Sequence, residues 1–121
     1  MYCFIRADLP IEQQIVQAAH SSLEAGRDLG KPSSNSHLIL LEAKSQDQLL
    51  KISQRLAAAG IKFRMFYEPD HNRGYTSITT EPISQDQDRA FFKKYTLYKF
   101  KAETAYSARE EFSATIGELN D

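Results

Sequence analysis

The chain has 121 residues and a formal net charge of −1 at pH 7. This length predicts one domain that can bury a core, and the near-zero charge gives no electrostatic sign of a nucleic-acid or membrane partner. The single cysteine, Cys3, argues against a disulfide scaffold and a zinc site and fits a reducing compartment. No signal peptide or membrane-spanning run is visible, so we expect a cytoplasmic protein without membrane contact.

The stretch from Tyr2 to Ala25 begins with a strand and continues into a helix. Residues 2–5 (YCFI) form a short apolar run of residues that favour strands. Asp8 and Pro10 then predict a helix start, because a short acceptor side chain can cap a helix and proline is tolerated in the first turn. A strand followed at once by a helix is therefore the first unit of the predicted fold.

The helix after Pro10 carries two stripes with a period near 3.6 residues. We expect its inner face to be the apolar stripe, formed by Ile11, Ile15, Ala18, Ala19, Ser22 and Leu23. A polar stripe on another side consists of Gln13, Gln17, His20 and Glu24. The ordinary interpretation of the polar stripe is a solvated face. The alternative is a ligand site, since its first member lies at a helix N-terminus, where free N–H groups favour anions.

The middle of the chain alternates strands and helices. Residues 26–36 (GRDLGKPSSNS) predict a loop, and residues 37–41 (HLILL) predict a central strand buried on both faces. Ser45 and Gln48 form a capping box that opens the next helix, and Gly60 suits its C-terminal cap. The residues of this helix that we expect to face inward are Leu49, Ile52, Leu56 and Ala59.

The last strands and helices follow from periodicity and capping patterns. Residues 61–67 (IKFRMFY) and 75–80 (YTSITT) predict two strands. Residues 68–74 between them are too few for a parallel crossover, so the two strands should be antiparallel neighbours. Two further capping boxes, Ser84–Gln87 and Ser107–Glu110, predict a helix after the fourth strand and a C-terminal helix. The apolar stripe of the C-terminal helix consists of Phe112, Ile116 and Leu119.

The order β-α-β-α-β-β-α with an appended helix predicts an α/β fold. We expect a three-layer α/β/α sandwich around a four-stranded mixed sheet, with three parallel strands and one antiparallel strand. The domain should cover residues 1–100, and a helical extension should cover residues 101–121.

Residues 89–101 contain five basic residues, no acidic residue and several aromatic rings. The ordinary interpretation is an amphipathic segment with buried rings and solvated lysines. The alternative is a phosphate-binding face with stacking rings, in which Lys93 and Lys94 contact a nucleic acid.

Ligands of such sheets bind beyond the carboxyl ends of the parallel strands. The polar residues that should converge there are Arg6, Asp8, Gln13, Glu68, Asp70, His71 and Thr76, and Gln17 and His20 of the helix stripe are further candidates for ligand binding. Each has an ordinary alternative role in a cap, turn, strand or solvated face. Glu68 is the strongest candidate, because it ends an apolar strand, where a carboxylate would be partly desolvated. There is no phosphate-binding glycine loop, cysteine pair, HExxH or GxSxG motif, so we predict no metal site and no cofactor.

Several of these motifs resemble the type II, archaeal and eukaryotic peptidyl-tRNA hydrolases. Asp8-Leu9-Pro10 and Gln17-Ala18-Ala19-His20-Ser21 stand where this family has the end of its first strand and its Gln-Ala-His helix motif. Thr76-Ser77-Ile78 and Pro82 match its last strand and the proline after it. The resemblance covers roughly residues 2–95. It departs at Gln13, where the family has a lysine, and at the shorter loop 69–73.

The resemblance implies hydrolysis of the ester between an acyl or peptidyl group and tRNA. Glu68 would position or deprotonate water, with Thr76 assisting, and Gln13 and Gln17 would hold the carbonyl or ribose. Lys93 and Lys94 would contact tRNA phosphates. The family also implies a homodimer.

A second hypothesis treats the same rim as a binding module for a nucleotide or another small anionic ligand, without turnover. The missing lysine and the near-neutral charge favour this alternative. A third and weaker hypothesis is a structural protein that binds its partner through the C-terminal helix.

Overall fold

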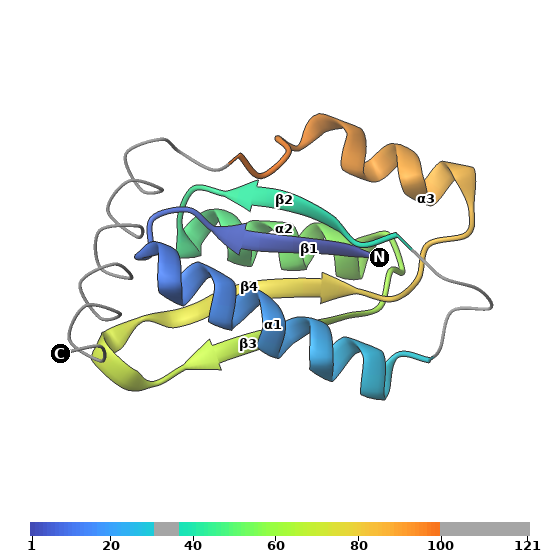
Figure 1. Cartoon of the computed structure of the whole chain (residues 1–121). Coiled ribbons are helices and arrows are strands. Elements are labelled where there is room, and N and C mark those ends of the chain that lie inside the picture. The colour runs from blue at the N-terminus through green and yellow to red at the C-terminus, as the bar shows by residue number, and fades with distance from the viewer. Residues whose placement is uncertain (31–36, 100–121) are drawn as a thin grey trace, which may run out of the picture.

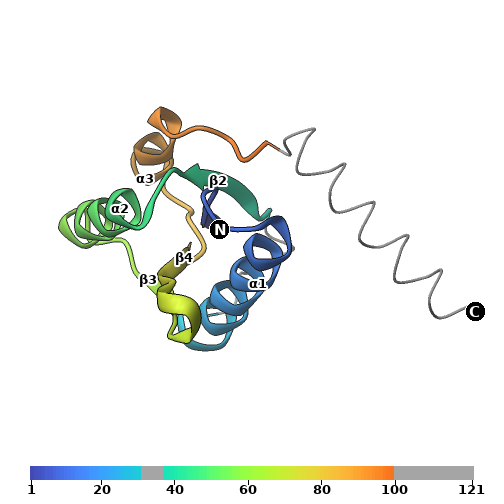
Figure 2. The same cartoon turned by 90° about the vertical axis from the view of Figure 1, so that its left-hand side faces the viewer.

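The computed structural model describes residues 1–30 and 37–99. A four-stranded sheet lies between α1 on one face and α2 and α3 on the other (Figures 1 and 2). The elements are β1 (Tyr2–Arg6), α1 (Ile11–Asp28), β2 (Ile39–Ala43), α2 (Gln46–Ala58), β3 (Phe63–Glu68), β4 (Gly74–Thr80) and α3 (Asp86–Phe91), with short 3-10 turns at Asp70–Asn72 and Phe92–Lys94. The expected α/β class with a four-stranded mixed sheet is confirmed. The predicted helix over 101–121 lies outside the described residues.

The strand order is β2-β1-β4-β3, which corrects the expected pairing of three parallel strands. Among the described residues, only β1 and β2 form a parallel pair. Strand β4 pairs antiparallel with both β1 and β3 and so separates them, and Leu41 and Leu97 add one isolated antiparallel bridge. Strands β1, β2 and β3 share one direction, but the short β3–β4 turn places β4 beside β3, so β3 forms no ladder with β1 or β2.

Strand β2 lies at the edge of the sheet, which corrects the expected central strand over residues 37–41. It begins two residues later, at Ile39. His37 and Leu38 precede it and are exposed, and Leu40 within it is exposed as well. An apolar run alone does not distinguish a central strand from an edge strand that has been left partly uncovered.

The main hydrophobic core fills the space between the sheet and α2. Leu49, Ile52 and Leu56 of α2 are fully buried against Phe4 and Ile78 of the sheet, as their spacing predicts, whereas Ala59 is exposed. Phe92 closes the same core from the segment after α3 and stacks on Tyr2 with ring centroids 3.8 Å apart.

The local signals at the two ends of α2 are confirmed. The Ser45 side chain accepts a hydrogen bond from the Gln48 backbone N–H at 3.2 Å, as in a capping box, while the Gln48 side chain accepts from the Lys44 N–H. At the other end Gly60 adopts a positive φ of 73°. The Gly60 and Ile61 N–H groups donate to the Ala57 and Leu56 carbonyls, which is a Schellman motif.

Helix α1 buries a face that lies between its two predicted stripes and takes only Ile11 from the apolar one and Gln17 from the polar one, which corrects the predicted orientation. Its buried residues are Ile11, Gln14, Gln17, Ser21 and Ala25. Ile15 and Leu23, expected inside, are largely exposed. The physical reason is the facing strand: β4 presents Thr76, Ser77 and Thr79 toward α1, and buried hydroxyls need hydrogen-bond partners that an apolar stripe cannot provide.

Three predicted helix boundaries are also corrected. Asp8 does not cap α1, because its carboxylate pairs with Arg6, and Pro10 occupies the N-cap position without a side-chain hydrogen bond. Helix α1 continues through Asp28 into the expected loop. Helix α3 begins after Gln85 with no side-chain cap, so the capping box predicted at Ser84 is not formed.

Within the described residues, no helix is long and apolar enough to cross a membrane.

Replacing Gly74 by alanine is expected to destabilise the protein by about 2 kcal/mol. Gly74 has a φ of +71°, which costs a non-glycine residue about 1–2 kcal/mol. An added Cβ would also overlap Gln46 Oε1, which accepts a hydrogen bond from the Tyr75 N–H at 2.7 Å. Urea denaturation checks this value. Gly26→Ala in α1 is the control, since nothing lies near its added Cβ, and an equal loss of stability in both variants would contradict the prediction.

Candidate functional site

The candidate site lies where β3 ends, β4 begins and the N-terminal half of α1 passes over them. Gln17 connects its members. The Gln17 Nε2 group donates to Gln13 Oε1 and to Glu68 Oε2, both at 3.2 Å, and Gln17 Oε1 accepts from the Thr76 hydroxyl at 3.1 Å. The structure therefore brings together four of the predicted residues.

These four residues form two layers. Gln17 and Thr76 have no exposed surface, whereas Gln13 and Glu68 are half-buried. Only the outer pair can touch a ligand directly. The inner pair holds the outer side chains in position. The Thr76 hydroxyl donates to the Gln17 oxygen, and the Gln17 nitrogen donates to both Gln13 and Glu68.

A β-bulge in β4 creates the inner layer. Phe66 pairs with Ser77, and Tyr67 pairs with Tyr75, so that Thr76 is left out of the ladder with β3. As a result, both Thr76 and Ser77 reach Gln17: the Ser77 hydroxyl donates to the Gln17 carbonyl at 2.6 Å. Bulges often redirect side chains beside functional sites. Sequence analysis missed Ser77, because strict alternation along a strand would have placed it on the opposite face from Thr76.

The Glu68 carboxylate has donors on both oxygens. Its Oε1 accepts from the Asp70 backbone N–H at 3.1 Å, and its Oε2 accepts from Gln17. The Asp70 hydrogen bond, followed by that of Gln17, lowers the pKa of Glu68 despite some desolvation. Burial alone would raise the pKa of Glu68, but the hydrogen bonds lower this pKa by more. Glu68 is therefore ionised at neutral pH.

The Glu68 carboxyl carbon is expected to titrate below pH 4.5, its ordinary pKa, in an NMR pH titration. Since the folded-state pKa is lowered, these hydrogen bonds stabilise the fold above the ordinary pKa, and their contribution is lost as pH falls through the folded-state pKa. Gln17→Leu removes one donor and should move the midpoint upward. A wild-type midpoint at or above 4.5 would contradict the assignment of these two donors.

The loop after β3 has a constrained backbone. His71 and Asn72 both adopt a φ of +55°, in the left-handed region that few non-glycine residues occupy. Such conformations persist where surrounding contacts impose them, and they occur often at functional sites. Here the turn directs the Asp70 N–H toward Glu68, while the Asp70 and His71 side chains are exposed beside it.

Arg6 anchors this loop to the end of β1. Its Nε and Nη2 groups donate to the two carboxylate oxygens of Asp8 at 2.9 and 2.8 Å, and its Nη1 donates to the carbonyls of Arg73 and Tyr75. Asp8 is therefore at the predicted end of the sheet, but it serves to hold Arg6. The Arg73 Nη1 group is buried and has no hydrogen-bond partner among the described residues.

The remaining predicted residues divide between the two faces of the sheet. His20 is exposed on the α1 face and stacks on Phe66, with ring centroids 4.3 Å apart. Helix α3 lies on the opposite face (Figure 2), and Lys93 and Lys94 follow it in the chain. The Lys94 Nζ atom lies 5.0 Å from the centre of the Phe91 ring. The structure does not bring these lysines to the Gln17 network, and they match the ordinary interpretation of solvated lysines around buried rings.

Compared with models of known protein families, the sequence matches none. The comparison with curated proteins gives no match either.

Proposed function

We propose that this protein is an esterase of the peptidyl-tRNA hydrolase type, which cleaves the ester between an acyl or peptidyl group and tRNA. The observation that carries the proposal is the Gln17 network, because it holds a carboxamide and an ionised carboxylate side by side at the end of the sheet. These two groups provide what ester hydrolysis requires: a donor for the carbonyl oxygen and an acceptor for a proton of water.

In the proposed reaction, Glu68 orients a water molecule toward the ester carbonyl carbon. Its lowered pKa makes it a weak base that does not deprotonate water in advance. Glu68 therefore accepts the water proton while the new carbon–oxygen bond forms. The bond from the carbonyl carbon to the ribose oxygen then breaks, and that oxygen takes up the proton held by Glu68, which restores the carboxylate. Gln13 donates a neutral hydrogen bond through Nε2 to the oxygen that gains negative charge, since its Oε1 is held by Gln17.

Gln17 and Thr76 act as positioning residues in this proposal, because both are fully buried. His20 and His71 are exposed beside the outer pair and can contact the ribose or the acyl group. The lysines at positions 93 and 94 lie on the other face, so this surface for tRNA phosphates is separate from the proposed reaction centre.

A specific observation favours the alternative, a binding module for a nucleotide or another small anionic ligand. The buried Arg73 Nη1 has no partner among the described residues, and an anionic group beside it would satisfy this donor. Both oxygens of Glu68 also accept hydrogen bonds within the protein, which suits a structural carboxylate.

A release assay with an N-acetylated aminoacyl-tRNA distinguishes the two functions. The full-length protein is expected to release the acyl group faster than the rate in buffer, and no acceleration would contradict the esterase. Thermal-shift measurements with nucleotides test the alternative, because a ligand at 100 times its dissociation constant stabilises a protein by about 2.7 kcal/mol. We expect the protein to accelerate acyl release and nucleotides to leave its thermal unfolding midpoint unchanged.

Replacing Gln13 by lysine is expected to raise the release rate about tenfold. A cation at this position stabilises a developing negative charge better than a neutral amide does, and a gain of roughly 1.4 kcal/mol corresponds to a tenfold increase. The same assay measures the effect. Gln54→Lys on exposed α2 is the matched control for added charge. An equal increase in both variants would indicate general attraction of tRNA rather than chemistry at Gln13.

A further inference from the structure

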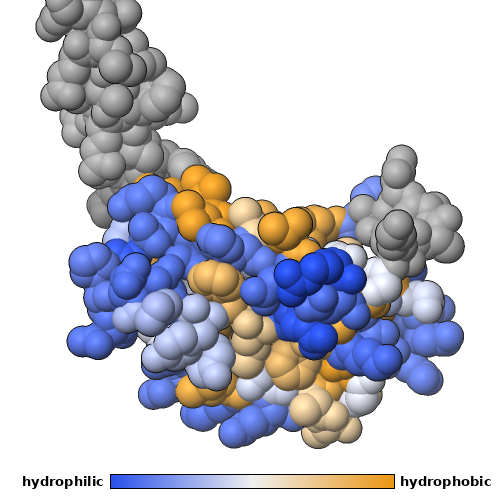
Figure 3. Space-filling model, turned by 90° about the horizontal axis from the view of Figure 1, so that it is seen from below, coloured by the Kyte–Doolittle hydropathy of each residue, from blue (hydrophilic) through white to orange (hydrophobic). Residues whose placement is uncertain are grey.

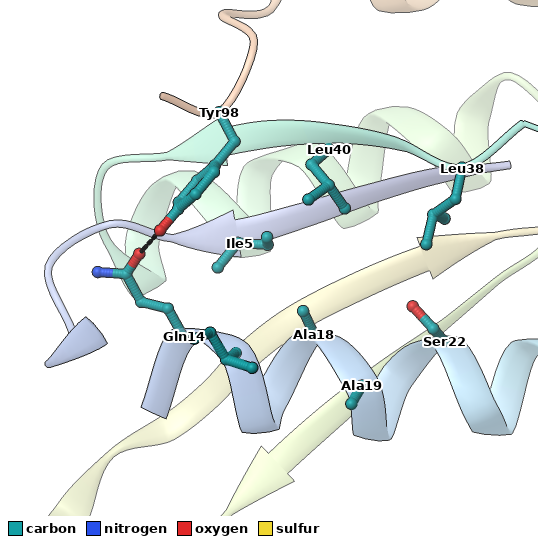
Figure 4. A pocket seen from close by; sticks show the side chains of 9 residues that line it. Ile5, Gln14, Ala18, Ala19, Ser22, Leu38, Leu40 and Tyr98 are labelled. Atoms are coloured by element: carbon teal, nitrogen blue, oxygen red, sulfur yellow. Dashed lines mark hydrogen bonds between the residues drawn. The ribbon is translucent and has the colours of Figure 1, made fainter. Parts of the chain in front are cut away.

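A hollow lies on the other side of α1 from the Gln17 network. It has a volume of about 280 Å³ and is bounded by α1, β1 and β2. Its walls are almost entirely apolar and include Ile5, Ile15, Ala18, Leu38, Leu40 and Tyr98 (Figure 4). We call this hollow the α1–β2 groove. At one end of the groove the Tyr98 hydroxyl donates to Gln14 Oε1, and Ser22 also lines the groove.

The groove follows from the orientation of α1. With the face from Gln14 to Ser21 buried, α1 presents Ile15 and the small residue Ala18 to this hollow. Ile15, Leu38 and Leu40 remain 62%, 50% and 37% exposed. Figure 3 shows hydrophobic surface exposed between hydrophilic side chains on the face seen from below. A contiguous apolar surface of this kind usually binds a partner.

The chain itself leads to this groove. After α3 it crosses the β2 edge, where the Glu42 N–H donates to the Thr96 carbonyl at 2.8 Å and the Tyr98 N–H donates to the Leu40 carbonyl at 2.9 Å. Tyr98 then forms the end wall of the groove. The described part of the chain ends at Lys99, one residue after this wall.

The sequence of the remaining segment suits this surface. Phe112, Ile116 and Leu119 recur at helical spacing, and a helix over residues 108–119 would be about 18 Å long. Strand β2, with five residues, spans about 17 Å along the groove. A chain of eight residues, the length of 100–107, can reach up to about 27 Å. A short tether also raises the effective concentration of the segment to the millimolar range.

We propose that residues 101–121 bind in the α1–β2 groove of their own chain, with Phe112, Ile116 and Leu119 against Ile15, Leu38 and Leu40. The occupant is thus the C-terminal segment rather than a second copy or a separate ligand. This inference is independent of the proposed esterase activity, because the groove and the Gln17 network lie on different sides of α1.

A spin label on the full-length chain tests the proposal. Ala114→Cys places a nitroxide opposite the predicted apolar stripe, and the native Cys3 is fully buried and so protected from labelling. We expect the methyl NMR signals of Ile15, Leu38 and Leu40 to lose intensity, while those of Leu49 and Ile52 in the α2 core keep it. The core signals also show that each variant remains folded.

Two comparisons complete the experiment. Ile116→Asp should restore the groove signals, whereas Ser113→Asp, which adds the same charge beside the stripe, should not. A second sample mixes two kinds of chain: one carries the spin label and no isotopes, and the other carries isotopes and no spin label. In this mixture the methyl signals of the groove should keep their intensity. Intensity loss confined to that mixture would replace the proposal with a dimer, and no loss in either sample would overturn binding of the segment.

Discussion

Replacing Glu68 by glutamine is expected to lower the rate of acyl release from tRNA by at least about 10²-fold. Glutamine keeps the size of the side chain and can still accept a hydrogen bond from the Asp70 N–H. It cannot accept a proton from water, and loss of a general base typically costs about 10²–10⁴ in rate. The release assay with wild-type and variant protein measures the effect directly.

Glu24→Gln provides the matched control for this prediction. Glu24 lies on the same helix stripe as Gln13 and Gln17 but near the other end of α1. Its replacement should leave the rate within a factor of two of wild type. If Glu68→Gln releases the acyl group as fast as Glu24→Gln does, Glu68 takes no part in the reaction, and the anion-binding alternative gains support.

Replacing Arg6 by methionine is expected to lower the free energy of unfolding by about 2–3 kcal/mol, because hydrogen bonds from a charged donor contribute roughly 1.5–3 kcal/mol. The Arg6 side chain is only 10% exposed and makes a two-point contact with Asp8. It also satisfies the carbonyls of Arg73 and Tyr75. Methionine leaves these acceptors without their donor and releases the loop that directs the Asp70 N–H toward Glu68.

Arg27→Met is the corresponding surface control. The Arg27 side chain is 68% exposed and pairs with its neighbour Asp28, and exposed ion pairs contribute about 0–1 kcal/mol. Urea denaturation of both variants should therefore separate them clearly. Similar losses of stability would contradict the role of Arg6 as the anchor between β1 and the loop after β3.

Part of the candidate site could be predicted from the sequence. Glu68 follows an apolar strand, and Gln13 and Gln17 share a helix stripe, so their convergence at one end of the sheet was expected, and the structure brings them within one network. The roles of Arg6 and Ser77 were not predictable. Arg6 acts through backbone carbonyls far along the chain, and Ser77 reaches Gln17 only because of the bulge in β4.

The sequence by itself determined the kind and order of the described elements and the ends of α2. These features depend on interactions within a few residues, such as the hydrogen bond from the Gln48 N–H to Ser45 and the positive φ of Gly60. The antiparallel pairing of β3 with β4 was also decided locally, because the connection between them is too short for a crossover.

Only the tertiary structure decided the place of β2 and the orientation of α1. An apolar run such as residues 38–41 suits a central or an edge strand, and the difference depends on which strands pair beside it. Helix α1 buries neither of its predicted stripes as a whole, because the buried hydroxyls of Thr76 and Thr79 required polar partners, which Gln17 and Ser21 provide. Since hydrogen-bond satisfaction is decided by the opposing surface, the helix sequence alone could not specify which face is buried.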